Sequence, residues 1–289
     1  MISIGATLSP QNRGEIAKLS LDFIEVKNIE PEFLESCSDV LSRFVTRTMH
    51  VQYLPSFDQK PTTLNLASSK TIQIIDDDKS TLFEAYRLLE PRLISFHLGF
   101  SSEEVGTEGI DNHNYARGRV LSKDETFEKI SMALLTISDQ FRKIGYKGEI
   151  LIENLDYHPT GAYEHICEAE FISDIIKYTG CFALFDVAHA MISSYHLGID
   201  VIDYVSKIDI DSIYEVHVNS PFYKDGEWYD INRPFHQLAE AEEITHIILN
   251  EKRKRGQELL LNIESDEEIG KQLSYLRRSI YVSQKEGTK

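Results

Sequence analysis

The sequence predicts an α/β fold in the form of a single (β/α)8 TIM barrel. Short apolar or β-branched runs recur eight times along the 289 residues, and segments with helical periodicity lie between them. Strand and helix alternate to the end of the chain, and no Pro/Gly/Ser linker or change in composition divides it. We therefore expect one domain over residues 1–289, with the barrel over about 1–265 and a C-terminal helix over about 266–285.

The eight runs have the lengths and the side chains of buried strands. They are Ile2 to Ala6, Phe23 to Val26, Thr46 to Val51, Leu93 to His97, Glu149 to Glu153, Phe182 to Asp186, Ile213 to Val218 and Leu259 to Glu264. The longest irregular stretches each follow a strand directly, which is where a barrel carries the loops of its active face. They are Pro55 to Lys70, Gly99 to Arg119 and Ser220 to Pro234.

The clearest helix is predicted from Ser122 to Ile144, because apolar residues repeat there at intervals of three and four. Ser122 and Glu125 form a capping box at its start, and Gly145 ends it. A second helical pattern closes at Gly256 after the basic run at residues 252–255, where positive side chains favour a helix end.

The charge of the chain argues against nucleic acid as a partner. Acidic side chains outnumber basic ones by 47 to 30, which gives a formal net charge of −17. Such a charge repels a phosphate backbone at long range, and the one clear basic run is explained by a helix end.

The three cysteines, Cys37, Cys167 and Cys181, are odd in number and widely spaced. They indicate neither a disulfide framework nor a thiolate zinc site, and they fit a reducing compartment. The N-terminus lacks the basic and apolar regions of a signal peptide, and no window approaches about 18 uninterrupted apolar residues. We therefore expect a cytoplasmic protein with no membrane partner.

Metal-ligand residues stand at the ends of most predicted strands. They are His50, His97, Glu153, Asp186, His217 and Glu264. The C-terminal ends of barrel strands all point toward one mouth, so residues far apart in sequence converge there. Each of these side chains alone would pass as a hydrogen-bonded structural residue, but their repeated placement predicts a metal site.

The ligand types and their number bear on the metals. Imidazole and carboxylate ligands without thiolates suit iron, zinc or manganese, and a carboxylate such as Glu153 can bridge two ions about 3.5–4 Å apart. Six candidate ligands are more than the protein ligands of a typical catalytic zinc site. His189 and Asp230 are additional candidate ligands for a further ion. The residues thus predict more than one metal ion.

The sequence resembles the multinuclear non-haem iron-dependent oxidative enzymes, formerly a family of unknown function within the xylose-isomerase-like TIM barrels. The resemblance covers about residues 90–265, and residues 1–90 match more loosely around Glu25 and His50. Its motifs are Glu153-Asn154, Glu170-Phe171, the Asp-x-x-His-Ala at 186–190 and the Glu-x-His at 215–217.

The resemblance implies a set of metal ligands. His50, His97 and Glu153 would bind one ion, and Glu153, Asp186, His217 and Glu264 a second. A third site is built in such barrels from the His of Asp-x-x-His and from an Asp-x-His motif. Here His189 and Asp230 are present, but the second motif ends in Asn232, a weaker donor than imidazole. We expect two well-held ions and a third that is labile or absent, unless His236 swings in.

Members of this family use iron and dioxygen to modify side chains, often cysteine, of ribosomally made precursor peptides, commonly beside a partner protein that presents the peptide. The resemblance therefore implies an oxidase that holds two or three ions, with iron favoured and zinc or manganese as alternatives. A second hypothesis is a metal-dependent sugar isomerase or phosphoester hydrolase of the related barrels. The charge and Asn232 argue against the DNA-cleaving version. A third hypothesis is a non-catalytic barrel that acts as a binding partner.

Further polar residues stand near the predicted mouth. Asn154 and Asn219 either orient ligands, contact substrate or cap their loops, and Glu25 is expected to be a pocket carboxylate rather than a ligand. Arg117 and Arg119 either bind a substrate carboxylate or are solvated loop charges. Five histidines do not end strands and are expected in surface or loop positions, with His158 the one closest to substrate. They are His113, His158, His165, His196 and His246.

Overall fold

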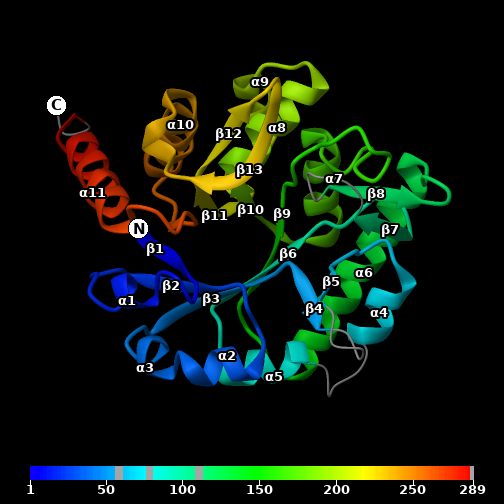
Figure 1. The fold of residues 1–289 in the computed structure, drawn as a ribbon, viewed down its shortest axis with the longest axis horizontal. Coiled ribbons are helices and arrows are strands. Elements are labelled where there is room, and N and C mark those ends of the chain that lie inside the picture. Colours follow the sequence, from blue (N-terminus) through cyan, green and yellow to red (C-terminus); the bar gives the residue numbers. More distant parts are fainter. Residues whose placement is uncertain (56–60, 76–80, 108–112, 287–289) are drawn as a thin grey trace.

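The computed structural model describes residues 1–55, 61–75, 81–107 and 113–286. Eight parallel strands close into a barrel in the order β1-β14-β11-β10-β9-β6-β3-β2, with helices around it (Figure 1). The barrel strands are β1 Ile2–Leu8, β2 Phe23–Val26, β3 Thr46–Val51, β6 Leu93–His97, β9 Glu149–Glu153, β10 Phe182–Asp186, β11 Ile213–Val218 and β14 Leu259–Ile263. The predicted fold class and all eight predicted strands are confirmed, with boundaries that differ by at most two residues.

Helices connect successive strands and cover the outside of the barrel. They are α1 Arg13–Ile16, α2 Pro31–Ser36, α3 Ser38–Leu41, α4 Ser69–Ile75, α5 Thr81–Leu89, α6 Lys123–Lys143, α7 Ala169–Thr179, α8 Val187–Leu197, α9 Val201–Ser206, α10 Ala239–Lys254 and α11 Ile269–Glu286, with short 3-10 turns η1 Ile210–Ser212 and η2 Phe235–Gln237. In α6, Ser122 and Glu125 form the predicted capping box, and Gly145 follows the helix with φ 90°. In α10, the basic last turn runs into Gly256 with φ 66°.

The three stretches expected to be irregular are not irregular throughout, and this expectation was wrong. The second and third each contain a two-stranded antiparallel hairpin, and the first contains the second strand of another, whose first strand ends at Pro55. The hairpins are β4 Tyr53–Pro55 with β5 Pro61–Thr63, β7 Glu104–Thr107 with β8 Asn114–Arg117, and β12 Ser220–Lys224 with β13 Glu227–Arg233. Parts of the first two stretches, residues 56–60 and 108–112, lie outside the described residues. Five of the six hairpin strands have five residues or fewer, and β13, with seven, does not alternate apolar and polar residues, so periodicity does not reveal them.

The interior of the barrel is apolar toward the N-terminal ends of the strands and polar toward their C-terminal ends. Alternate residues of each strand point inward, and the N-terminal halves supply a small apolar cluster inside the barrel, formed by Phe23, Leu93, Leu151, Leu184 and Leu260. Gly5 makes room for this layer, because a Cβ there would lie 2.6 Å from the Phe23 ring. The larger apolar core lies between the strands and the helices. Inward positions nearer the C-terminal ends of the strands are polar and equally buried.

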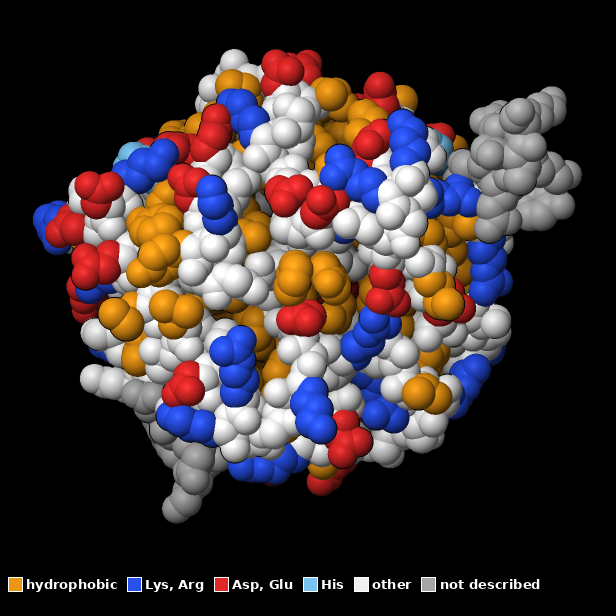
Figure 2. All heavy atoms as spheres, turned by 180° about the vertical axis from the view of Figure 1, so that it is seen from behind, with side chains coloured by type: hydrophobic (Ala, Val, Ile, Leu, Met, Phe, Trp, Pro, Cys, Tyr) orange, Lys and Arg blue, Asp and Glu red, His pale blue; other side chains and the backbone are white. Residues whose placement is uncertain are grey.

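The outer surface carries charges of both signs. On the face turned away from the viewer of Figure 1, acidic and basic side chains are interspersed among apolar ones (Figure 2). Among the described residues, no helix combines the length and the apolar character needed to cross a membrane.

Candidate metal centre

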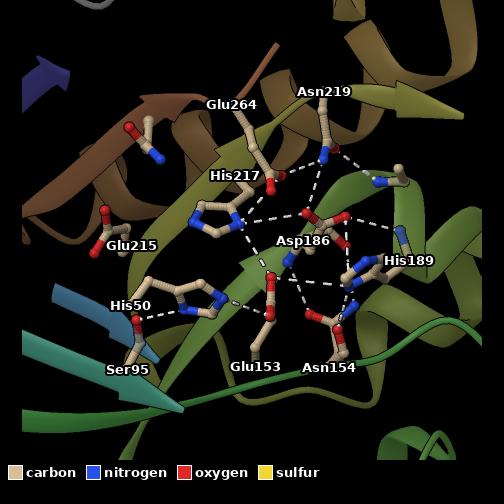
Figure 3. Close-up of polar contacts among 12 residues, drawn as sticks. His50, Ser95, Glu153, Asn154, Asp186, His189, Glu215, His217, Asn219 and Glu264 are labelled. Atoms are coloured by element: carbon tan, nitrogen blue, oxygen red, sulfur yellow. Dashed lines mark hydrogen bonds and ion pairs between the residues drawn. The ribbon is translucent and has the colours of Figure 1, made fainter. Parts of the chain in front are cut away.

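The six predicted strand-end ligands converge at the mouth of the barrel. Figure 3 labels His50, Glu153, Asp186, His217 and Glu264 among them. Five of the six lie at or next to the last residue of a barrel strand and point inward. Glu264 follows the end of β14 by one residue. His50, Glu153, Asp186 and His217 are fully buried, and the His97 side chain is 17% exposed. The closed parallel sheet thus gathers residues that are up to 214 positions apart in the sequence, from 50 to 264.

One donor group consists of His50, His97 and Glu153. The Nε2 atoms of His50 and His97 lie 3.3 Å and 2.8 Å from the same carboxylate oxygen, Glu153 Oε2. The donor atoms of the three residues lie within 4.8 Å of one another, which is compatible with one shared ion. Burial lowers the pKa of His50 to about 4, so its ring is neutral at pH 7 and offers a lone pair.

A second donor group consists of Asp186, His217 and Glu264. The Nδ1 atom of His217 lies 3.4 Å from Asp186 Oδ2 and 3.3 Å from Glu264 Oε2. The same nitrogen lies 3.0 Å from Glu153 Oε1. Glu153 therefore turns one oxygen toward each group, which is the arrangement of a bridging carboxylate.

The converging atoms fit a metal ion because they lack other partners. Nε2 of His50 and His97, Nδ1 of His217 and both oxygens of Glu153 are buried and make no hydrogen bond to any described residue. Buried polar atoms are almost always hydrogen-bonded, so a convergent group without such bonds is unusual. A cation at the centre would satisfy these lone pairs together, and its donors are imidazoles and carboxylates, which suit a borderline or hard transition-metal ion.

Neighbouring residues fix the orientation of the histidine rings. The Nδ1 atom of His50 lies 2.8 Å from Ser95 Oγ, and the Nε2 atom of His217 lies 2.8 Å from Glu25 Oε2. In each ring the nitrogen that faces away from the site is held, which leaves the other nitrogen directed into it. The predicted pocket carboxylate Glu25 thus contacts the outer side of His217 rather than the mouth.

A third group lies around His189 on α8. Asp186 ends β10 and also caps α8, since its Oδ1 accepts a hydrogen bond from the His189 N–H at 2.8 Å. The His189 ring places Nδ1 2.8 Å from the Asn154 carbonyl oxygen and Nε2 3.2 Å from Asp230 Oδ2. The donor atoms of Glu153, Asp186 and His189 also lie within 4.8 Å of one another.

Asn232 and His236 have other partners in the structure. The Oδ1 atom of Asn232 accepts a hydrogen bond from Asn219 Nδ2 at 2.8 Å. The His236 ring stacks on Tyr275, and its Nε2 lies 3.4 Å from Glu268 Oε2. Neither residue therefore adds a free donor to the third group in this structure.

Two asparagines hold Asp186 in place. Asn154 donates to the Asp186 carbonyl oxygen at 2.9 Å and accepts from the Asp186 N–H at 2.8 Å. The Nδ2 atom of Asn219 lies 2.8 Å from Asp186 Oδ2 and 2.7 Å from Glu264 Oε2. These contacts set the position of two carboxylates that face the second donor group.

Two further residues of the centre received no role from the sequence: Lys27 was not singled out, and Glu215 was named only as part of the Glu-x-His motif. The Lys27 ammonium donates to Glu264, and Glu215 is fully buried beside Thr48. Burial, together with the charge of Glu25, raises the pKa of Glu215 to about 8. Strand alternation could have found both, because Lys27 lies two residues after Glu25, and Glu215 two residues before His217.

His158 lies in the loop after β9, as expected from the sequence, but it is buried there. His158 is only 3% exposed, and its Nε2 lies 2.9 Å from Asp156 Oδ2. Its ring lies against that of His113, with ring centroids 3.6 Å apart. The cause is tertiary, because the β7–β8 hairpin packs on the loop after β9 through Asn114 and Tyr163. Arg119 pairs with Glu125 at the start of α6.

The fold and the buried donor groups define a (β/α)8 barrel with a candidate multinuclear metal centre at its mouth. Residues 61–276 match the family described as "RiPP precursor modification enzyme MbnB/TglH/ChrH". The chain therefore belongs to this family of metal-dependent enzymes, and the resemblance noted from its motifs is confirmed.

Curated relatives match part of the chain. A UPF0276 protein of Caulobacter vibrioides is 24% identical over 130 residues, 45% of this chain and 42% of the relative. A UPF0276 protein of Vibrio parahaemolyticus is 26% identical over 133 residues, 45% of this chain and 41% of the relative. The matched part thus spans less than half the length of these relatives.

Solved structures share the fold over almost the whole chain. A D-tagatose 3-epimerase-like protein is 16% identical with a TM-score of 0.66, covering 98% of this chain and 99% of its own. Endonuclease IV from Thermus thermophilus is 16% identical with a TM-score of 0.58, covering 96% and 99%. At this identity the likeness concerns the fold, which is that of the xylose-isomerase-like barrels.

Proposed function

We propose that this protein is a multinuclear iron- and dioxygen-dependent oxidase that modifies a side chain, such as cysteine, of a ribosomally made precursor peptide. Family membership supports the substrate class. The observation that carries the proposal is the convergence of His50, His97 and His217 on the two oxygens of Glu153, with no competing hydrogen bonds from the described part of the chain.

We assign one ion to His50, His97 and Glu153, and a second to Glu153, Asp186, His217 and Glu264. His189 and Asp230 are the donors of a third, weaker site, with Asn232 as its doubtful member. Bound iron would supply redox chemistry with dioxygen, whereas zinc or manganese would supply Lewis-acid chemistry. We infer a cytoplasmic location, because all three cysteines are free and buried.

The protein's own residues prepare the site. Ser95 and Glu25 fix the two imidazoles, and Asn154 and Asn219 fix Asp186, so little reorganisation is needed when ions and substrate enter. The apolar layer at Phe23 and its neighbours closes the barrel below the polar zone. A peptide would approach from the opposite end, where the β12–β13 hairpin carries Asp230, and a separate recognition protein would present it.

The proposal is tested by elemental analysis of anaerobically purified protein, followed by optical and Mössbauer spectra on admitting air. Roughly two or more irons per chain with a mixed-valence signal would support it. Zinc or manganese without a redox response would contradict it, and would direct the search to sugar and phosphoester substrates such as those of the related barrels. Stable metal binding with no turnover of any of these classes would favour a non-catalytic binding role.

Matched variants make the result specific to the proposed centre. We expect His97→Ala to lower the iron content and to abolish the spectral response. His246→Gln serves as the control, because His246 lies on the outer helix α10 and should leave both unchanged.

A further inference from the structure

A lysine lies inside the candidate centre, although none of the ligand assignments includes it. Lys27 follows β2 directly and shares the inward side of that strand with Glu25, two residues earlier. Its side chain is 16% exposed, and its Nζ donates to Glu264 Oε1. A buried lysine is rare unless it is paired, so this contact places a fixed positive charge beside a proposed metal ligand.

The Lys27 ammonium is charged at pH 7, because a lysine side chain ordinarily titrates well above that pH and here it is paired with a carboxylate. Lys27 is therefore an internal cation of the centre.

The two oxygens of Glu264 have different surroundings. Oε1 accepts from Lys27. Oε2 lies 2.7 Å from Asn219 Nδ2 and 3.3 Å from His217 Nδ1, on the side of the second donor group. An ion held by that group would find only one oxygen of Glu264 free of the lysine.

We propose that Lys27 is a positioning residue that limits Glu264 to one-oxygen coordination and weakens the second metal site. Its ammonium occupies Oε1 of Glu264 and withdraws charge from this ligand, whereas the group of His50, His97 and Glu153 makes no such ion pair with a lysine of the described residues. The second ion accordingly binds after the first and exchanges more readily. This inference rests on the ligand assignment of the proposed function.

The test is a titration of metal-free protein with Co²⁺, followed by calorimetry and by visible absorption. We expect two binding steps in the wild type. Lys27→Met should tighten the second step by about tenfold or more and leave the first within about threefold. Lys27→Arg should resemble the wild type. Lys27→Gln, which removes the charge but keeps a donor for Oε1, should also tighten the second step and serves if the Met variant does not fold.

A double-mutant cycle shows whether the effect passes through Glu264. In a Glu264→Gln background, Lys27→Met should have little or no effect on the second step. An unchanged or weakened second step in the neutral Lys27 variants would overturn the inference, as would an equal tightening with Glu264→Gln. Failure of the proposed centre itself gives a different result, namely no bound Co²⁺ at either step.

Discussion

Three candidate histidine ligands are each oriented by a neighbouring group that contacts one of the two ring nitrogens. Ser95 holds His50, Glu25 holds His217, and the Asn154 carbonyl holds His189. Such contacts fix the tautomer and the ring plane, and they commonly change metal affinity by about 10- to 100-fold. The partners are a hydroxyl, a carboxylate and a backbone carbonyl, so the three rings differ in basicity.

The contact between Glu25 and His217 predicts a site-specific effect. Glu25→Gln replaces a carboxylate acceptor by a neutral amide, which makes the opposite nitrogen of His217 a poorer donor. We expect the second Co²⁺ step to weaken by about tenfold, with the first step within about threefold. Calorimetry on metal-free protein measures both. Ser95→Ala is the matched variant for the first donor group, since it should weaken the first step instead. An equal loss of affinity at both steps in either variant would contradict the assignment.

Glu215 predicts a pH dependence of stability in the metal-free protein. Burial and the charge of Glu25 raise its pKa from 4.5 to about 8, so the folded state binds the proton more tightly than the unfolded state. The free energy of unfolding must therefore contain a component that falls as the pH rises from about 4.5 to about 8.

Replacing Glu215 by glutamine removes this component. In urea unfolding at pH 5 and pH 8, we expect Glu215→Gln to lose less stability between the two pH values than the wild type does. Glu25 has the opposite behaviour. Although burial opposes it, His217 and Lys27 lower its pKa to about 2, so its contribution is lost only as the pH falls below 4.5. An identical pH slope in Glu215→Gln and wild type would refute the prediction.

At the scale of elements, the β12–β13 hairpin adds side chains to the mouth of the barrel. Strand β13 alternates so that Trp228, Asp230 and Asn232 share one side. Asp230 reaches His189, Asn232 reaches Asn219, and Trp228 lies 6.4 Å from the Tyr195 ring of α8. The hairpin therefore adds Asp230 to the third donor group, whose other members come from α8 and the barrel strands.

This arrangement predicts that Asn232→His strengthens the third site. Imidazole is a better donor than an amide oxygen, and φ 49° at this position is accessible to histidine as well as to asparagine. We expect the variant to bind one further Co²⁺ equivalent that the wild type binds weakly. Trp228 is the only tryptophan in the chain, so its fluorescence reports this step directly. Asn232→Ala is the control, and a histidine variant with wild-type stoichiometry would count against the third site.

At the scale of the whole molecule, the barrel combines an apolar lower layer with a highly charged upper one. Leu93, Leu151 and Leu184 pack below, while Glu153 and Asp186 lie buried above. Burying carboxylates without a matching cation is unfavourable. Bound ions would offset this cost, so metal binding and stability should be linked.

We expect metal loading to raise the free energy of unfolding by about 4 kcal/mol per site when the free ion is about 1,000-fold above its Kd. Glu153→Gln should reduce this gain more than His97→Ala, because Glu153 faces both principal donor groups and His97 only one. Thermal and urea unfolding with Zn²⁺ or with a chelator measure the difference. Equal losses in the two variants would show that Glu153 does not bridge.

Much of the barrel could be predicted because its signal is local. The run from Phe182 to Asp186 is read as a strand from five consecutive side chains, and the structure gives the same bounds. The helix after Ser122 is likewise fixed by its own cap and periodicity. The gathering of the strand-end ligands follows from these local predictions, since a closed parallel barrel brings all C-terminal strand ends together. Their roles as ligands stay predictions.

Only the tertiary structure decided the features in which contacts between distant segments outweigh local preference. Three features are of this kind. The pairing of Lys27 with Glu264 and the burial of His158 depend on partners far away in the chain. The hairpin β12–β13 consists of strands without a clear period. The sequence by itself determined the barrel, the order of its strands and the residues at their ends, because periodicity and strand-end position are written in neighbouring side chains. Which nitrogen faces the centre, and which charge sits beside which carboxylate, are set by packing, because burial and pairing exist only once the barrel has closed.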